Sequence, residues 1–358
     1  MSRGNVRQSV LQRKPRVIVD GIGTGGHYYP AVVVAQALKR KNLEVIFLAR
    51  RGFLEEKVAQ DYGLRTFSIS AYPFYGKSPT RKLFFLLALA FAVYRLHALT
   101  KDAVGIAFGG FGAVPLIISC MMNGSMYYVF EPNRVPGRAT KRFSQSAKRV
   151  FFGLPSISRS DSTSVVTGIP VRREFKEAEK KSTRKKKNSR TSLLFYGGSQ
   201  GARRLNDLAL ELQDIIPRDW YVTIITGTND YERVVRLKSV RTKVIPFTES
   251  PWQVINRADI VISRAGALAG YEILCLGRKV IFVPFPYAID NHQFYNAEYF
   301  TSMGDAMVCE EKDVNAQMII EQIRKFLVQK RKVKAKIPKD AEEKIVDYMI
   351  HDIVYEKA

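Results

Sequence analysis

The sequence has few cysteines, few acidic residues and no apolar run at its start. Its three cysteines, Cys120, Cys275 and Cys309, are far apart and form no Cys-x-x-Cys pair. This odd, scattered set argues against a disulfide framework or a zinc site, and it suits a reducing cytosol. The first sixteen residues, MSRGNVRQSVLQRKPR, contain no apolar run, so we do not expect a signal peptide.

The shortage of acidic residues leaves a strongly basic chain. The sequence has 33 Asp and Glu against 57 Lys and Arg, a net charge of +24, of which +17 falls within residues 1–172. Such a balance predicts anionic partners. Nucleic acid is not expected, because the basic clusters at 180–190 and 324–339 have few aromatic residues to stack on bases.

The longest apolar run, Leu83–Tyr94, has twelve residues and is shorter than the ~20 that a membrane-spanning helix needs. Two interpretations stay open: a buried core helix, or a helix lying in the headgroup layer of a membrane. We favour the second, because basic residues flank the run. The expected membrane-facing residues are Arg81, Lys82, Leu83, Phe84, Phe85, Leu86, Phe91 and Arg95.

The 358 residues exceed the ~250–300 at which a single core stops growing, so two domains are expected. Short apolar strands alternate with helical segments, which predicts an α/β fold with doubly wound parallel sheets. A strand, a glycine loop and a helix open both halves, at 16–41 and at 192–212. We therefore predict two Rossmann-like domains, 1–171 and 172–340, with a helix at 341–358 packing back on the first.

The glycine loops suit phosphate groups, since a helix N-terminus follows each one. Gly21-x-Gly23-x-x-Gly26 also fits a dinucleotide fingerprint, but the second strand ends in Arg50-Arg51 instead of a ribose-binding acid. We expect no nicotinamide cofactor.

His27 follows the first glycine loop and is the candidate general base. Near a helix N-terminus the imidazolium is disfavoured, so a neutral ring is expected. The alternative is a capping or packing histidine. The four histidines of the sequence form no metal cluster, and we expect no bound metal.

Two further groups suit a sugar nucleotide. Glu272 follows the small-residue loop after the strand at 260–263. There its carboxylate could either interact with the positive end of the helix dipole or accept hydrogen bonds from a ribose diol. The polar run Asp290-Asn-His292-Gln293 offers partners for sugar hydroxyls.

Seven motifs in order, GIGTGGHYYPA, GGFGAVP, FEPNRVPG, TGIPVR, GGSQGARRLN, SRAGALAGYE and DNHQFYNA, resemble the MurG family of GT-B glycosyltransferases. The resemblance extends from Gly21 to Ala297. It implies two Rossmann-like domains with a cleft between them. It also implies transfer of N-acetylglucosamine from UDP-N-acetylglucosamine to the undecaprenyl-diphosphate-muramyl-pentapeptide, lipid I, which forms lipid II for peptidoglycan.

The resemblance also implies roles for individual residues. The C-terminal domain would hold the donor and the N-terminal domain the acceptor, against the membrane. His27 would be the base, with Glu131 in reserve, and Thr24, Gly25 and Gly26 would line the acceptor loop. The other substrate-binding residues would be Asn133, Arg172, Ser199, Gln200, Phe247, Thr248, Glu272, His292 and Gln293, where Arg172 and Ser199 would stabilise the departing diphosphate.

Two motifs depart from the family pattern. Phe130-Glu131-Pro132-Asn133 stands where the family commonly has HEQN, and Gly109-Gly110-Phe111 where it has GGY. Alternatives are a GT-B transferase with another lipid acceptor, a nucleotide-sugar epimerase, or a non-catalytic binder of membrane surfaces. The expected location is peripheral, at the cytoplasmic face of the cell membrane.

Overall fold

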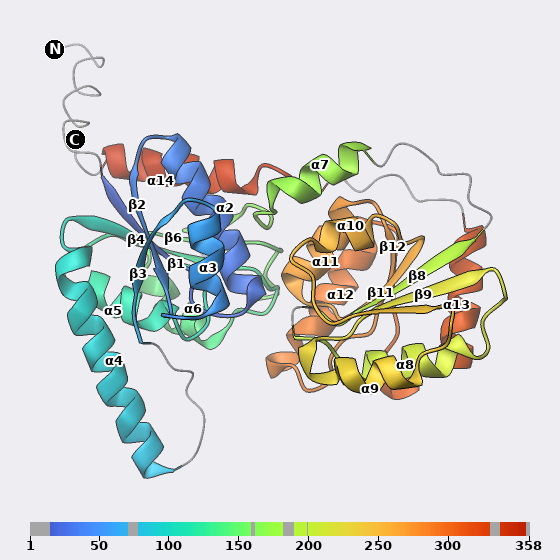
Figure 1. Cartoon of the computed structure of the whole chain (residues 1–358). Helices are drawn as coiled ribbons and strands as arrows, with labels where there is room; N and C mark the ends of the chain where they lie inside the picture. Colours follow the sequence, from blue (N-terminus) through green and yellow to red (C-terminus); the bar gives the residue numbers. More distant parts are fainter. Residues whose placement is uncertain are drawn as a thin grey trace. The chain divides into compact units, whose positions relative to one another are not determined.

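The computed structural model describes residues 15–70, 78–158, 162–181, 190–198, 200–329 and 337–355. The chain forms two compact units (Figure 1). Unit 1 comprises residues 1–170 and 340–358, and unit 2 comprises residues 171–339.

Unit 1 is built on a parallel sheet of seven strands in the order β3-β2-β1-β4-β5-β6-β7. The three central residues of β1, Val17, Ile18 and Val19, have no exposed surface. Continuous buried β-branched runs are typical of parallel strands covered on both faces. The strands are β1 (Arg16–Asp20), β2 (Glu44–Ala49), β3 (Arg65–Ser68), β4 (Ala103–Ala107), β5 (Tyr127–Glu131), β6 (Arg149–Phe152) and β7 (Ser164–Val166).

Helices cover both faces of this sheet (Figure 1). They are α2 (Gly25–Arg40), α3 (Leu54–Asp61), α4 (Pro79–Thr100), α5 (Ala113–Met122), α6 (Arg138–Phe143) and, from the end of the chain, α14 (Ala341–Tyr355). A bidentate ion pair holds α14 on the sheet, since the Arg149 guanidinium donates to both carboxylate oxygens of Asp352 at 2.7 Å. The Tyr128 hydroxyl, 3.3 Å away, donates to the same carboxylate.

Helix α4 is longer than its apolar run. It has 22 residues, and its segment Thr80–Thr100 is the one helix in the described part of the chain long and apolar enough to cross a membrane. Length therefore does not exclude a span, contrary to the sequence expectation. Its C-terminal half, however, is part of the domain core, because Ala92, Leu96 and Thr100 are buried and the helix packs on α5.

Unit 2 has a parallel sheet of six strands in the order β10-β9-β8-β11-β12-β13. The strands are β8 (Thr191–Tyr196), β9 (Trp220–Ile225), β10 (Thr242–Ile245), β11 (Ile260–Ser263), β12 (Lys279–Phe282) and β13 (Ala306–Val308). The helices are α7 (Arg173–Lys181), α8 (Arg203–Gln213), α9 (Tyr231–Leu237), α10 (Pro251–Ile255), α11 (Ala267–Cys275), α12 (His292–Met303) and α13 (Ala316–Val328). In both units the strand order reverses beside the first strand, which is where α/β sheets bind ligands.

Candidate active site

The carboxyl edge of the unit 1 sheet carries the first glycine loop and His27. Strand β1 ends at Asp20 and α2 begins at Gly25, so His27 lies in the first turn of the helix. Its Nδ1 lies 3.2 Å from the Thr24 hydroxyl. The other ring nitrogen, Nε2, lies beside the loop after β4, since a Cβ placed on Gly110 would be 3.5 Å from it. In the tautomer in which Nδ1 donates to the Thr24 hydroxyl, Nε2 is the acceptor.

The half-buried position of His27 sets its charge. Burial lowers the pKa of the imidazole from 6.5 to about 4, because removal from water disfavours the imidazolium. The ring is neutral at physiological pH, as expected from the sequence. The physical cause is desolvation, whereas the sequence pointed to the helix N-terminus.

Glu131 does not suit the reserve role of base that the sequence suggested. Its carboxylate is buried and accepts four hydrogen bonds from the loop that follows β5. Oε1 accepts from the backbone and side-chain amides of Asn133 at 3.1 and 3.0 Å. Oε2 accepts from the Gly137 N–H and the Thr140 hydroxyl, both at 2.8 Å. Both oxygens are engaged in shaping this loop, which leaves His27 as the candidate base.

The carboxyl edge of the unit 2 sheet carries the second glycine loop. Strand β8 ends at Tyr196 and α8 begins at Arg203. Gln200 is exposed on this loop, while Ser199 lies outside the described residues. A side chain at position 201 would overlap the carbonyl oxygen of Thr226, so this loop lies directly against the one that follows β9.

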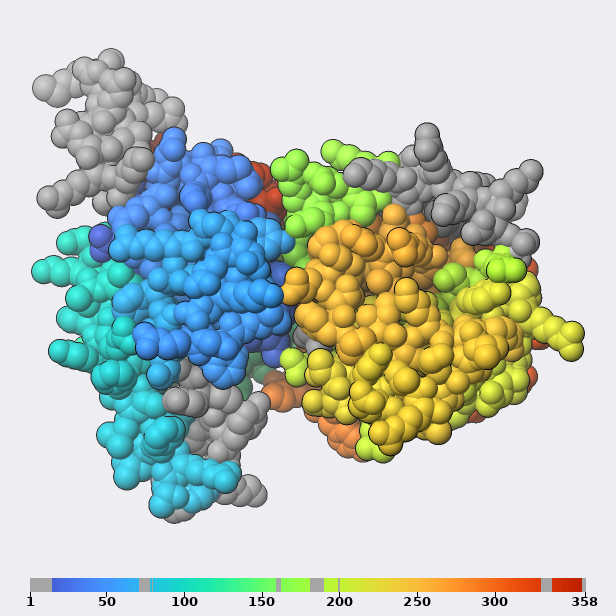
Figure 2. Space-filling view, viewed as in Figure 1, coloured from blue at the N-terminus to red at the C-terminus, as the bar shows by residue number. Residues whose placement is uncertain are grey.

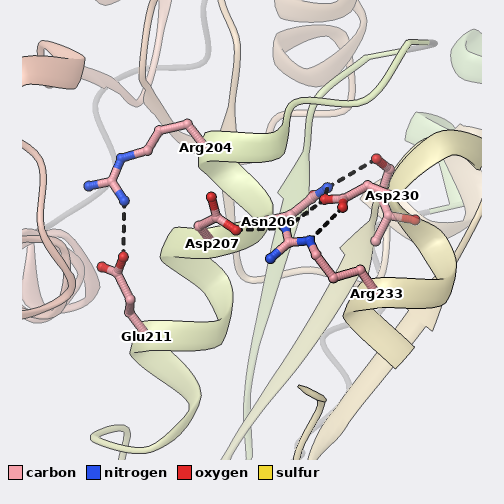
Figure 3. A network of polar contacts seen from close by, with 7 residues as sticks. Arg204, Asn206, Asp207, Glu211, Asp230 and Arg233 are labelled. Atoms are coloured by element: carbon pink, nitrogen blue, oxygen red, sulfur yellow. Dashed lines mark hydrogen bonds and ion pairs between the residues drawn. The ribbon is translucent and has the colours of Figure 1, made fainter. Parts of the chain in front are cut away.

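A polar network joins the same two loops (Figure 3). Asn206, in the first turn of α8, donates from Nδ2 to the Thr226 carbonyl at 3.1 Å and to Asp230 at 2.8 Å. Arg233 lies between two carboxylates, with nitrogens 2.7 Å from Asp230 and 2.6 Å from Asp207. The guanidinium lowers the pKa of Asp230. Side chains of α8 and α9 thus hold the glycine loop in place. We name Asn206, Asp207, Asp230 and Arg233 the α8–α9 clamp.

Glu272 is the sixth residue of α11 and is buried, so it lies beyond the first turn, where a carboxylate would interact with the helix dipole. Its Oε1 accepts a hydrogen bond from Arg172 at 3.1 Å. Burial raises the pKa of the Glu272 carboxyl, and the Arg172 charge opposes that shift. The pair places a carboxylate, held by a cation, in the helix that follows β11.

Both amino groups of the buried Arg172 donate hydrogen bonds within the protein, which corrects the expectation that it meets a diphosphate directly. One amino group donates to Glu272 and the other to the Glu249 carbonyl at 3.4 Å. The guanidinium lies 5.0 Å from the centre of the Phe175 ring and 5.2 Å from that of Trp252. A buried cation so enclosed positions Glu272.

Phe247 and Thr248 follow β10 and are half-buried. The Thr248 hydroxyl oxygen accepts a hydrogen bond from the Ser250 N–H at 3.1 Å. Its O–H remains able to donate to a base edge, as a border of a uracil site requires.

His292 and Gln293 open α12 after two consecutive left-handed residues, Asp290 and Asn291. His292 Nδ1 lies 2.8 Å from the Ile289 carbonyl, so it carries the proton and Nε2 is the acceptor. Gln293 Oε1 accepts from the Phe285 N–H at 3.0 Å, which leaves its amide nitrogen as the group that can meet a sugar hydroxyl.

Sequence reasoning missed three residues near these edges. Asp20 is buried at the end of β1, and Arg233 holds the α8–α9 clamp. Arg264 donates to the Val283 and Pro284 carbonyls at 3.0 and 3.2 Å and pairs with Glu311. Arg264 lies in a motif already quoted, directly after a strand, and that position was the available signal. Each of the other two also interacts with a distant segment, Asp20 with the Phe108 N–H and Arg233 with Asp207, and no local pattern reveals these contacts.

No group of three or more His, Cys, Asp or Glu side chains within the described ranges could hold a metal ion.

Comparison with known proteins assigns both units. Residues 17–152 match the N-terminal domain of glycosyltransferase family 28, and residues 192–350 match its C-terminal domain. A protein of Sulfurihydrogenibium sp. is 32% identical over 360 residues, covering 94% of this chain and 98% of the relative. The chain belongs to glycosyltransferase family 28. The resemblance noted in the sequence is thereby confirmed.

The family 28 relatives are consistently named. Those of Sulfurihydrogenibium sp. and Aquifex aeolicus are both called UDP-N-acetylglucosamine–N-acetylmuramyl-(pentapeptide) pyrophosphoryl-undecaprenol N-acetylglucosamine transferase. The Aquifex protein is 28% identical over 323 residues, covering 87% of this chain and 92% of the relative. As a member of family 28, the chain is a glycosyltransferase.

Solved structures agree on the fold. The crystal structure of Acinetobacter baumannii MurG matches with a TM-score of 0.70 at 24% identity, covering 94% of this chain and 99% of that one. UDP-GlcNAc 2-epimerase from Neisseria meningitidis matches with 0.66 at 12% identity, covering 94% and 100%. The fold is GT-B, as predicted. Because an epimerase shares it, the fold does not choose between the two reactions.

Proposed function

We propose that this enzyme transfers N-acetylglucosamine from UDP-N-acetylglucosamine to the muramyl 4-hydroxyl of lipid I and so forms lipid II. The proposal rests on the presence of two candidate sites in one family 28 chain. One is a glycine loop with a neutral histidine in unit 1, and the other is a glycine loop with the buried Glu272–Arg172 pair in unit 2.

Unit 2 supplies the donor site in this proposal. Glu272 accepts hydrogen bonds from the ribose diol, Phe247 and Thr248 border the uracil, and His292 and Gln293 contact the sugar. The diphosphate lies on the glycine loop around Gln200, where the N-terminus of α8 stabilises the charge that develops as UDP leaves. Ser199 belongs to this loop and remains a proposed contact.

Unit 1 supplies the acceptor site and the base. Thr24, Gly25 and Gly26 receive the acceptor diphosphate, and Asn133 borders that site. The muramyl 4-hydroxyl oxygen attacks the anomeric carbon, and the bond from that carbon to the UDP oxygen breaks on the opposite face, which inverts the configuration. The hydroxyl proton passes to Nε2 of His27. Proton transfer of this kind contributes ~10²–10⁴-fold to a rate.

Helix α4 carries the proposed membrane contact. Its exposed apolar side chains are Leu83, Phe84, Leu86, Leu87, Phe91 and Tyr94, which we name the α4 apolar face, and the basic flanks Arg81, Lys82 and Arg95 are exposed too. Phe85 is half-buried. In Figure 2 the N-terminal half of α4 projects from the body of unit 1. An exposed apolar surface that is flanked by basic residues can insert into the headgroup layer of an anionic membrane.

This arrangement implies a peripheral enzyme at the cytoplasmic face of the cell membrane. The residues of α4 that are buried in its C-terminal half support interfacial docking over a span, because crossing the bilayer would remove Leu96 and Thr100 from the core.

The test is incubation of the purified chain with labelled UDP-N-acetylglucosamine and a lipid I analogue. A β-linked disaccharide product is expected. With the donor alone, formation of UDP-N-acetylmannosamine would instead indicate an epimerase and would contradict the proposal. Transfer to another lipid but not to lipid I would contradict the acceptor assignment alone.

A further inference from the structure

Asp20 is a buried carboxylic acid at the end of β1, directly before the first glycine loop. Its side chain has no exposed surface. Oδ1 accepts a hydrogen bond from the Ile22 N–H at 3.0 Å, and the backbone N–H of Phe108 also lowers the pKa of the same carboxyl. Within the described parts of the chain, Oδ2 has no hydrogen-bond partner. Burying a carboxyl oxygen without a hydrogen bond lowers the stability of the folded protein. A residue kept at such a cost is a candidate for a functional role.

These two backbone N–H groups belong to different loops. Ile22 lies in the loop between β1 and α2, whereas Phe108 directly follows β4 and begins the loop that includes Gly109, Gly110 and Gly112. The loops also touch directly. A side chain added at Gly112 would overlap Ile22 and lie 2.8 Å from Asp20 Oδ1. One carboxyl therefore bridges two loops that are packed in van der Waals contact.

His27 depends on both of these loops. Its Nδ1 contacts Thr24 in the first loop, and its Nε2 lies beside Gly110 in the second. A change in the spacing of the loops would move the ring or open it to water. We propose that Asp20 is a positioning residue that joins the two loops and thereby fixes the His27 imidazole. The proposal rests on the proposed function, in which His27 is the base.

The charges around Asp20 agree with a bridging role. Burial, with a smaller contribution from the nearby Glu55 carboxylate, raises the pKa of Asp20 to about 7. Arg50 is the cation in this region, and it pairs with Glu55 at 2.6 Å. Hydrogen bonds from backbone N–H groups to an ionised carboxylate are about twice as strong as neutral ones. With a pKa of about 7 the Asp20 carboxyl is partly ionised near neutral pH, and the backbone N–H groups of Ile22 and Phe108 favour its ionised form.

Two substitutions separate the loops by different means. Asp20→Ala removes the acceptor, and Gly112→Ala adds a methyl group at the contact, where the backbone of Gly112 (φ −70°, ψ −27°) accepts alanine. In both, the pKa of His27, followed by NMR on histidine-labelled protein, should rise from about 4 towards 6.5. Turnover should fall roughly 10- to 100-fold while the Kd for UDP stays unchanged. Asp20→Asn keeps an acceptor and should restore the pKa of His27 and most of the turnover.

Asp352→Asn is the matched control, because Asp352 is also a buried acid of unit 1 but bonds to Arg149 and Tyr128. It should lower Tm and leave the pKa of His27 unchanged. If Asp20→Ala or Gly112→Ala folds and the pKa of His27 stays near 4, the proposal is wrong. Should Asp20→Ala fail to fold, Gly112→Ala decides alone. Absence of disaccharide formation by the wild-type enzyme would refute the proposed function without affecting the NMR result.

Discussion

Glu272 is the residue on which the donor site most depends. Its carboxylate is expected to accept charge-assisted hydrogen bonds from the ribose, worth ~1.5–3 kcal/mol each before losses. Glu272→Gln keeps an acceptor for the buried Arg172 and should raise the Kd for UDP about tenfold or more, measured by titration calorimetry. Glu211→Gln, at a partly exposed carboxylate on α8, should leave the Kd unchanged. An unaltered Kd in Glu272→Gln would remove Glu272 from the donor site.

His27 should also affect stability in a defined pH range. Its pKa is about 4 in the folded protein and about 6.5 when unfolded. Between these values the unfolded chain binds the proton and the native state does not, so His27 makes the protein less stable as pH falls from 6.5 to 4. Asp20, whose pKa is raised to about 7, acts in the opposite direction over an overlapping range.

The comparison is therefore between variants. As the pH falls from 6.5 to 4, the free energy of unfolding measured in urea should decrease less for His27→Gln than for the wild-type protein. Parallel curves for the two proteins would show that the imidazole is not desolvated.

The places of the candidate site residues were predictable from the sequence only where they follow from position along the chain. His27, Gln200 and His292 each follow a strand or open a helix, and local pattern placed them at the carboxyl edges. The Arg172–Glu272 pair joins positions 100 residues apart, so the sequence could not show that Arg172 is buried. Likewise, the four hydrogen bonds to Glu131 arise from how its own loop folds back.

Among the elements, α4 gives the sharpest contrast between a membrane face and a core face. Leu86 and Phe91 are 58% and 56% exposed, whereas Leu96 on the same helix has no exposed surface. The double variant Leu86→Glu with Phe91→Glu should abolish co-sedimentation with anionic liposomes and leave Tm within a few degrees. Leu96→Glu, the control, buries a charge and should unfold the domain. Liposome binding by the double variant would exclude the α4 apolar face as the contact.

In unit 2, the α8–α9 clamp joins the first turn of α8 to the start of α9. Arg233→Leu leaves the Asp207 and Asp230 carboxylates without the cation between them, so the ends of α8 and α9 should move apart. The Kd for UDP should rise about three- to tenfold, because the glycine loop lies against the loop that the clamp holds. Arg236→Leu removes the same charge from an exposed position on α9 and should have no effect. Equal Kd values for the two variants would refute the coupling.

At the scale of the whole molecule, the fold was predictable because the opening strand of each unit is short, apolar and followed by a glycine loop and a helix. The repeated opening pattern predicted the two α/β units of the GT-B fold, with strands such as β1 and β8 where expected. Sequence pattern could not supply the strand orders or the ion pair between Arg149 and Asp352 that holds α14, since both depend on contacts between distant segments.

The central claim is a division of labour in which unit 2 binds the donor and His27 of unit 1 takes the proton of the acceptor. The most direct test compares the turnover of His27→Ala with its Kd for UDP. Turnover should fall ~10²-fold or more, because general-base catalysis is lost, while the Kd stays within about twofold of wild type. A rise in the Kd as large as the fall in turnover would contradict the claim.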